Sequence, residues 1–163
     1  MTPVGIRPAT AADAEGIARV YLESAEHHAA IDPARYSVPG AAAILERYRT
    51  GAQHPHHGLD CITFIAEIDG GVAGFLDARI ERPFDAMHRP MVYCYVAEIA
   101  VAADRRSQGI GRLLMQAAEQ WGREKGAGVV SLEYNSKNPR AASFYERIGY
   151  EAATVLALKW LQK

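Results

Sequence analysis

A long amphipathic helix that begins at a glycine-rich segment is the feature of this sequence that most restricts its fold. Two β-rich runs flank the helix, Met91 to Val101 before it and Val129 to Tyr134 after it. A strand, a helix and a strand in this order predict a right-handed crossover with the two strands parallel. The helix is indicated by apolar residues that recur at helical spacing ahead of Gly126 and Gly128: Ile110, Leu113, Leu114, Ala117, Ala118 and Trp121.

Two further β-rich runs predict an antiparallel hairpin. They are Cys61 to Ile68 and Val72 to Glu81, and the turn signal Asp69-Gly70-Gly71 separates them. The run from Met91 to Val101 is apolar on both faces, which is typical of a central strand. We therefore expect an α/β (α+β) fold with a mixed, mostly antiparallel central sheet flanked by helices.

The rest of the chain predicts shorter elements. In chain order, the first helix is indicated by a pair of residues that resembles a capping box, and the second by an amphipathic patch. An Asn-Pro pair indicates the start of the third helix, and a β-rich run near the end of the sequence indicates a strand. The expected elements are a helix from Thr10 and Asp13 to about Ala25, a short helix around Ile44, Leu45 and Tyr48, a helix from Asn138 and Pro139 to Gly149, and a last strand over Thr154 to Leu161.

Length and charge restrict the classes of function. The chain has 163 residues, of which 49% are hydrophobic, so we expect one domain over residues 1–163. Its 18 basic and 19 acidic residues give a formal charge of -1, which disfavours a nucleic-acid-binding module. The sequence has neither a signal-peptide pattern nor an apolar stretch long enough to span a bilayer, so we expect a cytoplasmic protein with no membrane partner.

The cysteines and histidines do not predict a metal site. Cys61 and Cys94 are isolated in apolar runs, so we expect buried thiols. His54, His56 and His57 lie close together, but Pro55 disrupts helical ligand spacing and the cluster has no acidic or cysteine partner at a recognisable offset. We expect a solvated loop there, and a polar helix end at His27 and His28.

The segment from Arg106 to Arg112 carries the strongest sign of a binding site. At a helix start its backbone N–H groups point outward, and glycines at 109 and 111 leave room for a ligand. The partial positive charge of the first turn, with nearby arginines, suits a pyrophosphate. A dinucleotide fingerprint is excluded because Leu114 stands at the third glycine position, and the Gly-Lys-Ser/Thr of a P-loop is absent. The alternative is a tight turn with solvated arginines.

Three separated segments have residue types, and an order along the chain, that are found together in one enzyme superfamily. They are the strand Ala97-Glu98-Ile99-Ala100-Val101, the loop Arg106-x-x-Gly109-x-Gly111, and Asn138-x5-Phe144-Tyr145-Glu146-Arg147-x-Gly149-Tyr150. Together they resemble the GCN5-related N-acetyltransferase superfamily, over roughly Cys61 to Tyr150. The resemblance implies a sheet splayed between two central parallel strands, with the pantetheine arm of acetyl-coenzyme A in the gap.

The resemblance also implies which residues bind the coenzyme. Backbone groups of the strand, Ile99, Ala100 and Val101, pair with the pantetheine arm, which Asn138 also contacts. The pyrophosphate lies on the loop and first turn, formed by Arg106, Ser107, Gln108, Gly109, Ile110, Gly111 and Arg112. Lys137 and Arg140 either reach the adenosine phosphates or are solvated surface residues.

The expected acid is Tyr145, at the usual tyrosine position of the superfamily. A tyrosine of pKa ~10 can protonate a departing thiolate whose conjugate acid lies near ~8.5. The alternative is a packed aromatic residue. For the base, Glu98 is slightly favoured because its apolar neighbours should raise its pKa. Glu133 matches the place of the base in ribosomal-protein N-terminal acetyltransferases of this superfamily, and proton relay by ordered water is the third option.

We therefore expect an acetyl-coenzyme A-dependent N-acetyltransferase. It would transfer the acetyl group to a primary amine of a small molecule or protein N-terminus by direct attack in a ternary complex. A non-catalytic acyl-coenzyme A sensor is the alternative. The acceptor pocket would come from the least patterned segments, Glu26 to Gly58 and Arg82 to Pro90, so the acceptor is not predicted. Only 13 residues follow Tyr150, so we expect an acceptor pocket that is either more open or completed by a second subunit in a homodimer.

Overall fold

The computed structural model describes residues 3–51, 60–82 and 87–161. The chain divides into two compact units, residues 1–133 and residues 134–163. The first unit contains a sheet and the helices α1, α2 and α3, and the second contains α4. The predicted histidine cluster at residues 54, 56 and 57 lies outside the described residues.

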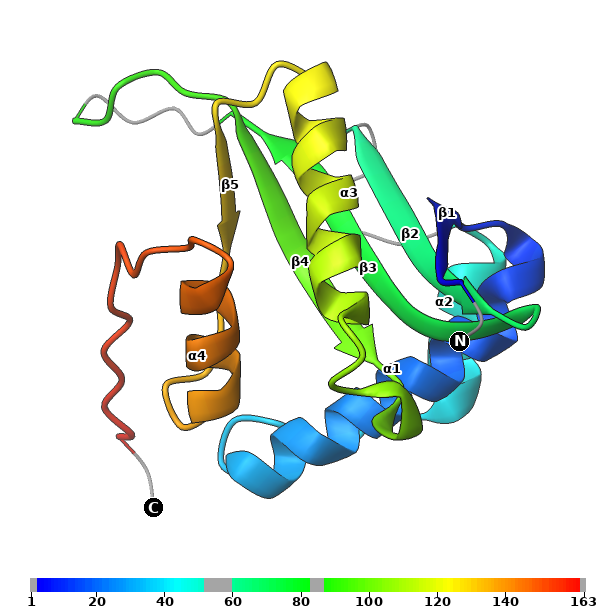
Figure 1. Ribbon diagram of the computed structural model, residues 1–163. Coiled ribbons are helices and arrows are strands. Elements are labelled where there is room, and N and C mark those ends of the chain that lie inside the picture. The colour runs from blue at the N-terminus through cyan, green and yellow to red at the C-terminus, as the bar shows by residue number, and fades with distance from the viewer. Residues whose placement is uncertain (1–2, 52–59, 83–86, 162–163) are drawn as a thin grey trace. The chain divides into compact units, whose positions relative to one another are not determined.

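The sheet of the first unit has five strands in the order β1-β2-β3-β4-β5 (Figure 1). Neighbouring strands from β1 to β4 pair antiparallel, and β4 and β5 pair parallel. The expected mixed, mostly antiparallel sheet is confirmed, and its strands are β1 (Gly5–Pro8), β2 (Cys61–Ile68), β3 (Gly71–Glu81), β4 (Tyr93–Val101) and β5 (Val129–Leu132). The sequence did not predict β1, which is only four residues long and ends in a proline.

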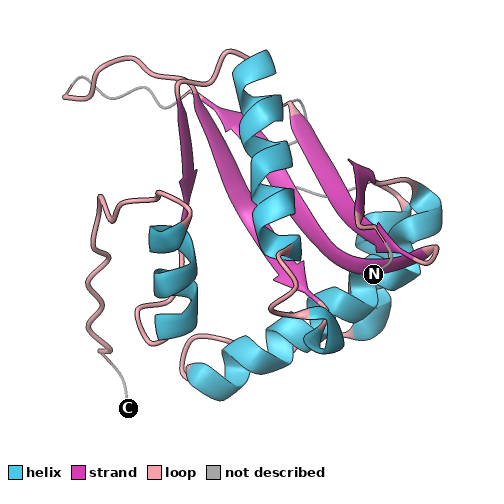
Figure 2. Cartoon of the chain, in the orientation of Figure 1, coloured by secondary structure: helices cyan, strands magenta, loops and turns pink. Residues whose placement is uncertain are grey.

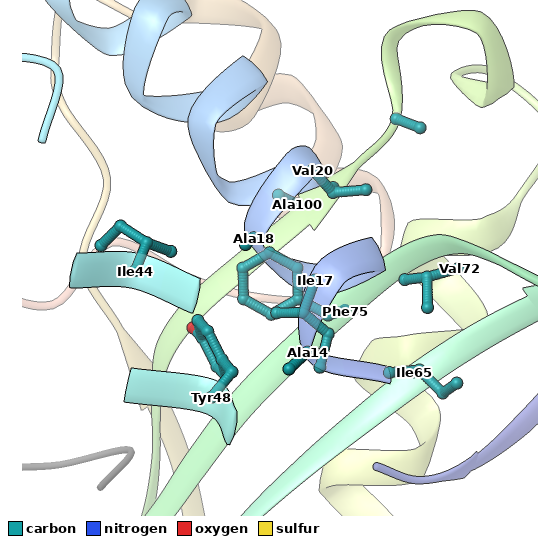
Figure 3. Packing of buried hydrophobic residues seen from close by; sticks show 11 residues of the cluster. Ala14, Ile17, Ala18, Val20, Ile44, Tyr48, Ile65, Val72, Phe75 and Ala100 are labelled. Atoms are coloured by element: carbon teal, nitrogen blue, oxygen red, sulfur yellow. The ribbon is translucent and has the colours of Figure 1, made fainter. Parts of the chain in front are cut away.

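Helices cover both faces of this sheet (Figure 2). The first-unit helices are α1 (Ala14–Ile31), α2 (Ala41–Arg49) and α3 (Ile110–Glu124). Side chains of β3 alternate between the two faces, as strand geometry requires. Phe75 packs against α1 and α2 (Figure 3), whereas a Cβ on Gly74 would come within 3.3 Å of both Ile110 and Leu114 on α3. The predicted long helix is thus confirmed, with its apolar stripe on the sheet.

Two expectations about the elements are wrong: where the first helix ends, and that a last strand forms. The first helix does not stop near Ala25 but continues to Ile31, because no helix breaker precedes Asp32 and Pro33. His27 and His28 therefore belong to the helix. The expected strand over Thr154 to Leu161 is absent, since a strand needs a neighbour for its backbone groups. Nothing in the described part of the chain pairs with this segment, and its apolar side chains are largely exposed, with Val155 at 90% and Leu161 at 87%.

The second unit contains one helix, α4 (Pro139–Arg147). The Asn138 side chain caps it, because Oδ1 accepts a hydrogen bond from the Ala141 N–H at 3.1 Å. Pro139 takes the first helical position, where its missing N–H costs nothing. Gly149, at φ 93°, follows the helix in the left-handed region. The predicted helix and its cap are confirmed.

Candidate active site

The parallel pair of strands opens along β4. Pairing between β4 and β5 runs from Tyr93 and Val129 to Val96 and Leu132, where β5 ends. Strand β4 continues to Val101 and stays paired with β3 on its other side (Figure 1). Among the described residues, no strand pairs with the outer edge of residues 97–101. Such an edge can accept an extended ligand as an added strand.

The glycine-rich segment lies directly beyond this open edge. Ser107, at φ 62°, and Gly109, at φ 80°, both adopt the left-handed conformation. The first backbone bond of α3 runs from the Leu113 N–H to the Gly109 carbonyl at 3.2 Å. The N–H groups of residues 109–112 therefore precede the helical ladder and are available to an anion. A Cβ at Gly109 would meet nothing within 4 Å, so the space beside the loop is open.

The arginines beside this loop have different roles. Arg106 donates from Nε to the Val101 carbonyl at 3.2 Å and so ties the loop to the end of β4. Arg105 pairs with the neighbouring Asp104 at 3.4 Å. Arg112 lies exposed in the first turn of α3. Arg112 can therefore approach a bound anion without breaking an interaction seen here, whereas Arg106 orients the backbone.

A β-bulge determines the face of the sheet on which Glu98 lies. Asp77 is paired with Glu98, but the next residue, Ala78, is paired with Val96, so Ala97 is an extra residue in β4. Because side chains alternate along a strand, one inserted residue reverses the faces beyond it. Ahead of the bulge, Cys94 lies against α3 and donates from Sγ to the Ala118 carbonyl at 3.6 Å.

Beyond the bulge, Glu98 lies on the α1 and α2 face. The Arg47 guanidinium of α2 lies near enough to lower its pKa, but burial and then the Asp77 carboxylate outweigh this effect and raise the pKa of Glu98 to about 7. The expectation of a raised pKa is confirmed, and the sequence missed that a second carboxylate contributes to it. The signal was Asp77 itself, an acid between Leu76 and Ala78 in β3.

Glu133, the competing base, follows the last residue of β5 and is exposed. Exposure keeps its side chain in contact with water, whereas Glu98 is only partly exposed. The two glutamates therefore occupy different environments within the first unit. Lys137 and Arg140 of the second unit are exposed, as either interpretation of them requires.

Tyr145 is the buried residue of α4, and its ring packs within an aromatic cluster of the second unit. It stacks on Tyr134 at a centroid distance of 5.5 Å and meets Phe144 and Tyr150 edge to face at 5.1 and 5.9 Å. The Tyr150 N–H also donates to the Tyr145 carbonyl at 3.0 Å. This packing fixes the ring, which both the catalytic and the structural interpretations of Tyr145 require.

No group of three or more His, Cys, Asp and Glu residues that could hold a metal occurs within residues 3–51, 60–82 and 87–161. In the same part of the chain, no helix is both long and apolar enough to cross a membrane. Cys94 is buried, and burial raises the pKa of its thiol to about 11, whereas Cys61 is only half-buried.

An open parallel strand pair beside a glycine-rich helix start defines an α/β protein suited to a phosphate-bearing ligand. The model of the acetyltransferase (GNAT) family matches residues 22–150. The chain belongs to this family of acyltransferases.

Curated relatives carry acetyltransferase names. Streptothricin acetyltransferase of Streptomyces lavendulae is 36% identical over 92 residues, 56% of this chain and 45% of that protein. The uncharacterized N-acetyltransferase YhfO of Bacillus subtilis is 27% identical over 93% of this chain and 92% of its own length. An N-alpha-acetyltransferase of Sulfurisphaera tokodaii is 34% identical over 57% of this chain and 58% of that protein. The chain thus spans about half the length of the first and third relatives.

Solved structures share the fold. A single-residue mutant of the BH1408 protein of Bacillus halodurans superposes with a TM-score of 0.84 at 21% identity, covering 96% of this chain and 99% of that one. The aminoglycoside N-acetyltransferase AAC(6')-Iy in complex with CoA has a TM-score of 0.73 at 19% identity, covering 100% and 97% of the two chains. At these identities the likeness establishes the fold alone.

Proposed function

We propose that residues 1–163 form one N-acetyltransferase domain that transfers the acetyl group of acetyl-coenzyme A to a primary amine in a ternary complex. The observation that carries this proposal is the open edge of β4 beside the N–H groups of residues 109–112, which make no hydrogen bond within the helix. The family match over residues 22–150 supports a single domain, because it extends across both compact units. The complex of AAC(6')-Iy with CoA supports the choice of coenzyme.

The proposed coenzyme site runs from β4 to α3. Backbone groups of Ile99, Ala100 and Val101 pair with the pantetheine arm as a neighbouring strand would. Residues 106–112 receive the pyrophosphate, since Gly109 leaves the space open and the helix start favours negative charge. Asn138 contributes its Nδ2 amide to the pantetheine arm, because its Oδ1 already caps α4.

Glu98 is the proposed general base. An acceptor amine of pKa ~10.4 costs roughly 4 to 5 kcal/mol to deprotonate at neutral pH, so a nearby proton acceptor is useful. With its pKa raised to about 7, Glu98 is partly ionised at neutral pH and holds a proton more strongly than an ordinary glutamate. Glu133 and an ordered water are the alternative acceptors.

Tyr145 is the proposed acid. During transfer a C–N bond forms to the amine, the C–S bond breaks, and the leaving thiolate takes the Tyr145 proton. The acceptor ammonium loses two protons overall. Glu98 takes one and returns it to solvent after turnover, and the other restores the Tyr145 hydroxyl.

The acceptor is proposed only as a class. The names of the relatives support both a small molecule, as in streptothricin and aminoglycoside acetyltransferases, and a protein N-terminus, as in an N-alpha-acetyltransferase. The acceptor segments expected from the sequence include residues 52–59 and 83–86, which lie outside the described residues. A cytoplasmic location and a homodimer remain predictions from the sequence.

Binding and turnover test the proposal separately. Calorimetry with coenzyme A should show saturable binding to the wild-type chain, and Gly109→Glu should abolish it by placing bulk and negative charge in the loop. Gly109→Ala is the matched control, since it imposes the same left-handed strain without the charge, and it should retain measurable binding. Undiminished affinity in Gly109→Glu would contradict the placement of the pyrophosphate.

An amine panel then decides between enzyme and sensor. With acetyl-coenzyme A present, an enzyme releases free thiol when a suitable amine is added, and the rate saturates with amine concentration. A sensor binds the coenzyme without release of thiol. Absence of coenzyme binding would reject both.

A further inference from the structure

Asp77 is a buried carboxyl group that the mechanism above does not use directly. It lies in the middle of β3 with 0% of its surface exposed. Two hydroxyls donate to it, Tyr48 of α2 to Oδ2 at 2.7 Å and Thr63 of β2 to Oδ1 at 2.6 Å. Three elements therefore hold this carboxyl group in one orientation. Burial raises its pKa, and the two hydrogen bonds, which stabilise the charged form, reduce this rise without cancelling it.

Asp77 and Glu98 form a cross-strand pair. They are directly opposite in the antiparallel register of β3 and β4, so their side chains lie on one face with Cβ atoms about 4.5 to 5.5 Å apart. Two carboxylates this close repel each other when both are ionised, and their titrations become coupled. The bulge at Ala97 creates the pair, because without it Glu98 would lie on the α3 face.

Other groups also face Glu98. From α2, the Arg47 guanidinium lowers the pKa of Glu98 and packs over the rings of Tyr21 and Tyr48 at 5.9 and 5.6 Å. From α1, Tyr21 lies near Glu98: the pKa of Tyr21 is raised by burial first and then by the Glu98 charge. On β4 itself, the pKa of Tyr95 is raised by burial first and then by Glu133, and Glu98 contributes least. Among these groups, Asp77 is the acid that is paired directly with Glu98 in the register of β3 and β4.

We propose that Asp77 is a positioning residue of the active site: held by Tyr48 and Thr63, its carboxylate faces Glu98 across the bulged register and sets the pH range in which Glu98 accepts the acceptor proton. This inference rests on the proposed role of Glu98 as base. Once one carboxyl group of the pair is ionised, its negative charge opposes ionisation of the other. The hydroxyls of Tyr48 and Thr63 favour the charge on Asp77, so Glu98 retains or accepts a proton near neutral pH. Asp77 itself does not touch the substrate.

A direct titration of Glu98 tests the coupling. Carbon NMR of the side-chain carboxyl groups, in the full chain, assigns the Glu98 resonance by its loss in Glu98→Gln. In Asp77→Asn, the titration midpoint of Glu98 should fall by about one pH unit or more. The acidic limb of kcat/KM against pH should move to lower pH by a similar amount. An unchanged Glu98 midpoint in folded Asp77→Asn would overturn the proposal.

Two further variants separate charge from structure. Tyr48→Phe keeps Asp77 but removes one donor, which disfavours the Asp77 carboxylate, so the Glu98 midpoint should fall by less than in Asp77→Asn. This variant serves as the test if Asp77→Asn does not fold, and no shift in it would then count against the proposal. The charge control is Asp60→Asn, since Asp60 is exposed and pairs with Lys125 at 3.2 Å, and it should leave the midpoint in place.

Failure of the proposed function gives a different result. If the chain neither binds coenzyme A nor releases thiol, the role of Glu98 as base is rejected, and the inference falls with it. The NMR titration would still show whether Asp77 controls the Glu98 midpoint. If the midpoint depends on Asp77 but the pH profile of an active enzyme does not, Glu98 titrates as described and another group is the base.

Discussion

At the residue scale, Glu98 is a glutamate whose environment opposes its charge. Its burial on the α1 and α2 face and the neighbouring Asp77 carboxylate both favour the protonated form. A structural glutamate gains nothing from this arrangement, because an isosteric glutamine would pack equally well without the electrostatic cost. Perturbed acids of this kind gather at catalytic sites.

The stability of the fold should depend on pH through Glu98. Its pKa rises from 4.5 to about 7 on folding, so between these values the folded chain binds more protons than the unfolded chain. The free energy of unfolding should therefore fall as the pH rises from 4.5 to 7. Glu98→Gln should flatten this dependence in urea unfolding measured at about pH 5 and about pH 8, on either side of the folded-state pKa. Glu124→Gln, an exposed change on α3, is the control, and parallel curves for wild type and Glu98→Gln would refute the prediction.

Tyr145 should matter for turnover and little for coenzyme binding. Tyr145→Phe keeps the ring in the aromatic cluster with Tyr134 and removes only the hydroxyl. We expect kcat to fall by about 10- to 100-fold, in the range of a lost general acid, with coenzyme affinity near wild type. Steady-state kinetics and calorimetry measure the two quantities. Tyr134→Phe is the control for a lost hydroxyl in the same cluster. An unchanged kcat in Tyr145→Phe would show that Tyr145 has no part in the mechanism.

At the scale of elements, the helix start and the sheet are pressed together at one glycine. A Cβ on Gly74 of β3 would come within 2.9 Å of the Ala100 carbonyl and 3.3 Å of Ile110 and Leu114. The backbone of β3 at Gly74 therefore packs directly against β4 and against the first turn of α3, and this contact fixes their positions. The geometry of the proposed coenzyme site depends on this close approach.

Gly74→Ala should disturb both the fold and the site. The clash with a backbone carbonyl cannot be relieved by side-chain rotation, so we expect about 1 to 3 kcal/mol of lost stability and weaker coenzyme binding. Urea unfolding and calorimetry measure these effects. Gly128→Ala is the matched control, because a Cβ there meets nothing within 4 Å. Equal stability of the two variants would show that the approach is not tight.

At the scale of the whole molecule, the C-terminal segment carries a run of exposed apolar side chains. Val155, Leu156, Leu158, Trp160 and Leu161 are all more than half exposed. Exposed apolar patches of this kind are typical of interaction surfaces. The sequence-based prediction of a homodimer is consistent with this exposure.

Sedimentation equilibrium tests the homodimer. The wild-type chain should sediment as a dimer, and Trp160→Asp should shift it toward monomer by placing a charge in the apolar segment. Val38→Asp makes the same change at another exposed apolar residue and should leave the dimer intact. A wild-type chain that stays monomeric at every concentration contradicts the prediction.

The sequence by itself determined the elements whose signals are local. The apolar stripe of α3, the turn between β2 and β3, and the Asn-Pro start of α4 depend on spacing and on backbone preference within a few residues. The glycine-rich loop was predictable for the same reason, since its conformation and its N–H groups follow from a short stretch of chain. The candidate residue Tyr145 was found through the family resemblance, whereas Glu98 was favoured because its neighbours along the strand are apolar.

Tertiary structure alone decided what depends on distant partners. The strand expected over Thr154 to Leu161 did not form, because β-structure requires a neighbour that sequence does not supply. The pairing of Asp77 with Glu98 depends on one inserted residue, Ala97, which shows up only when β3 and β4 are aligned. Local patterns predict how a segment folds; register between segments decides which side chains meet, because a shift of one residue exchanges the two faces of a strand.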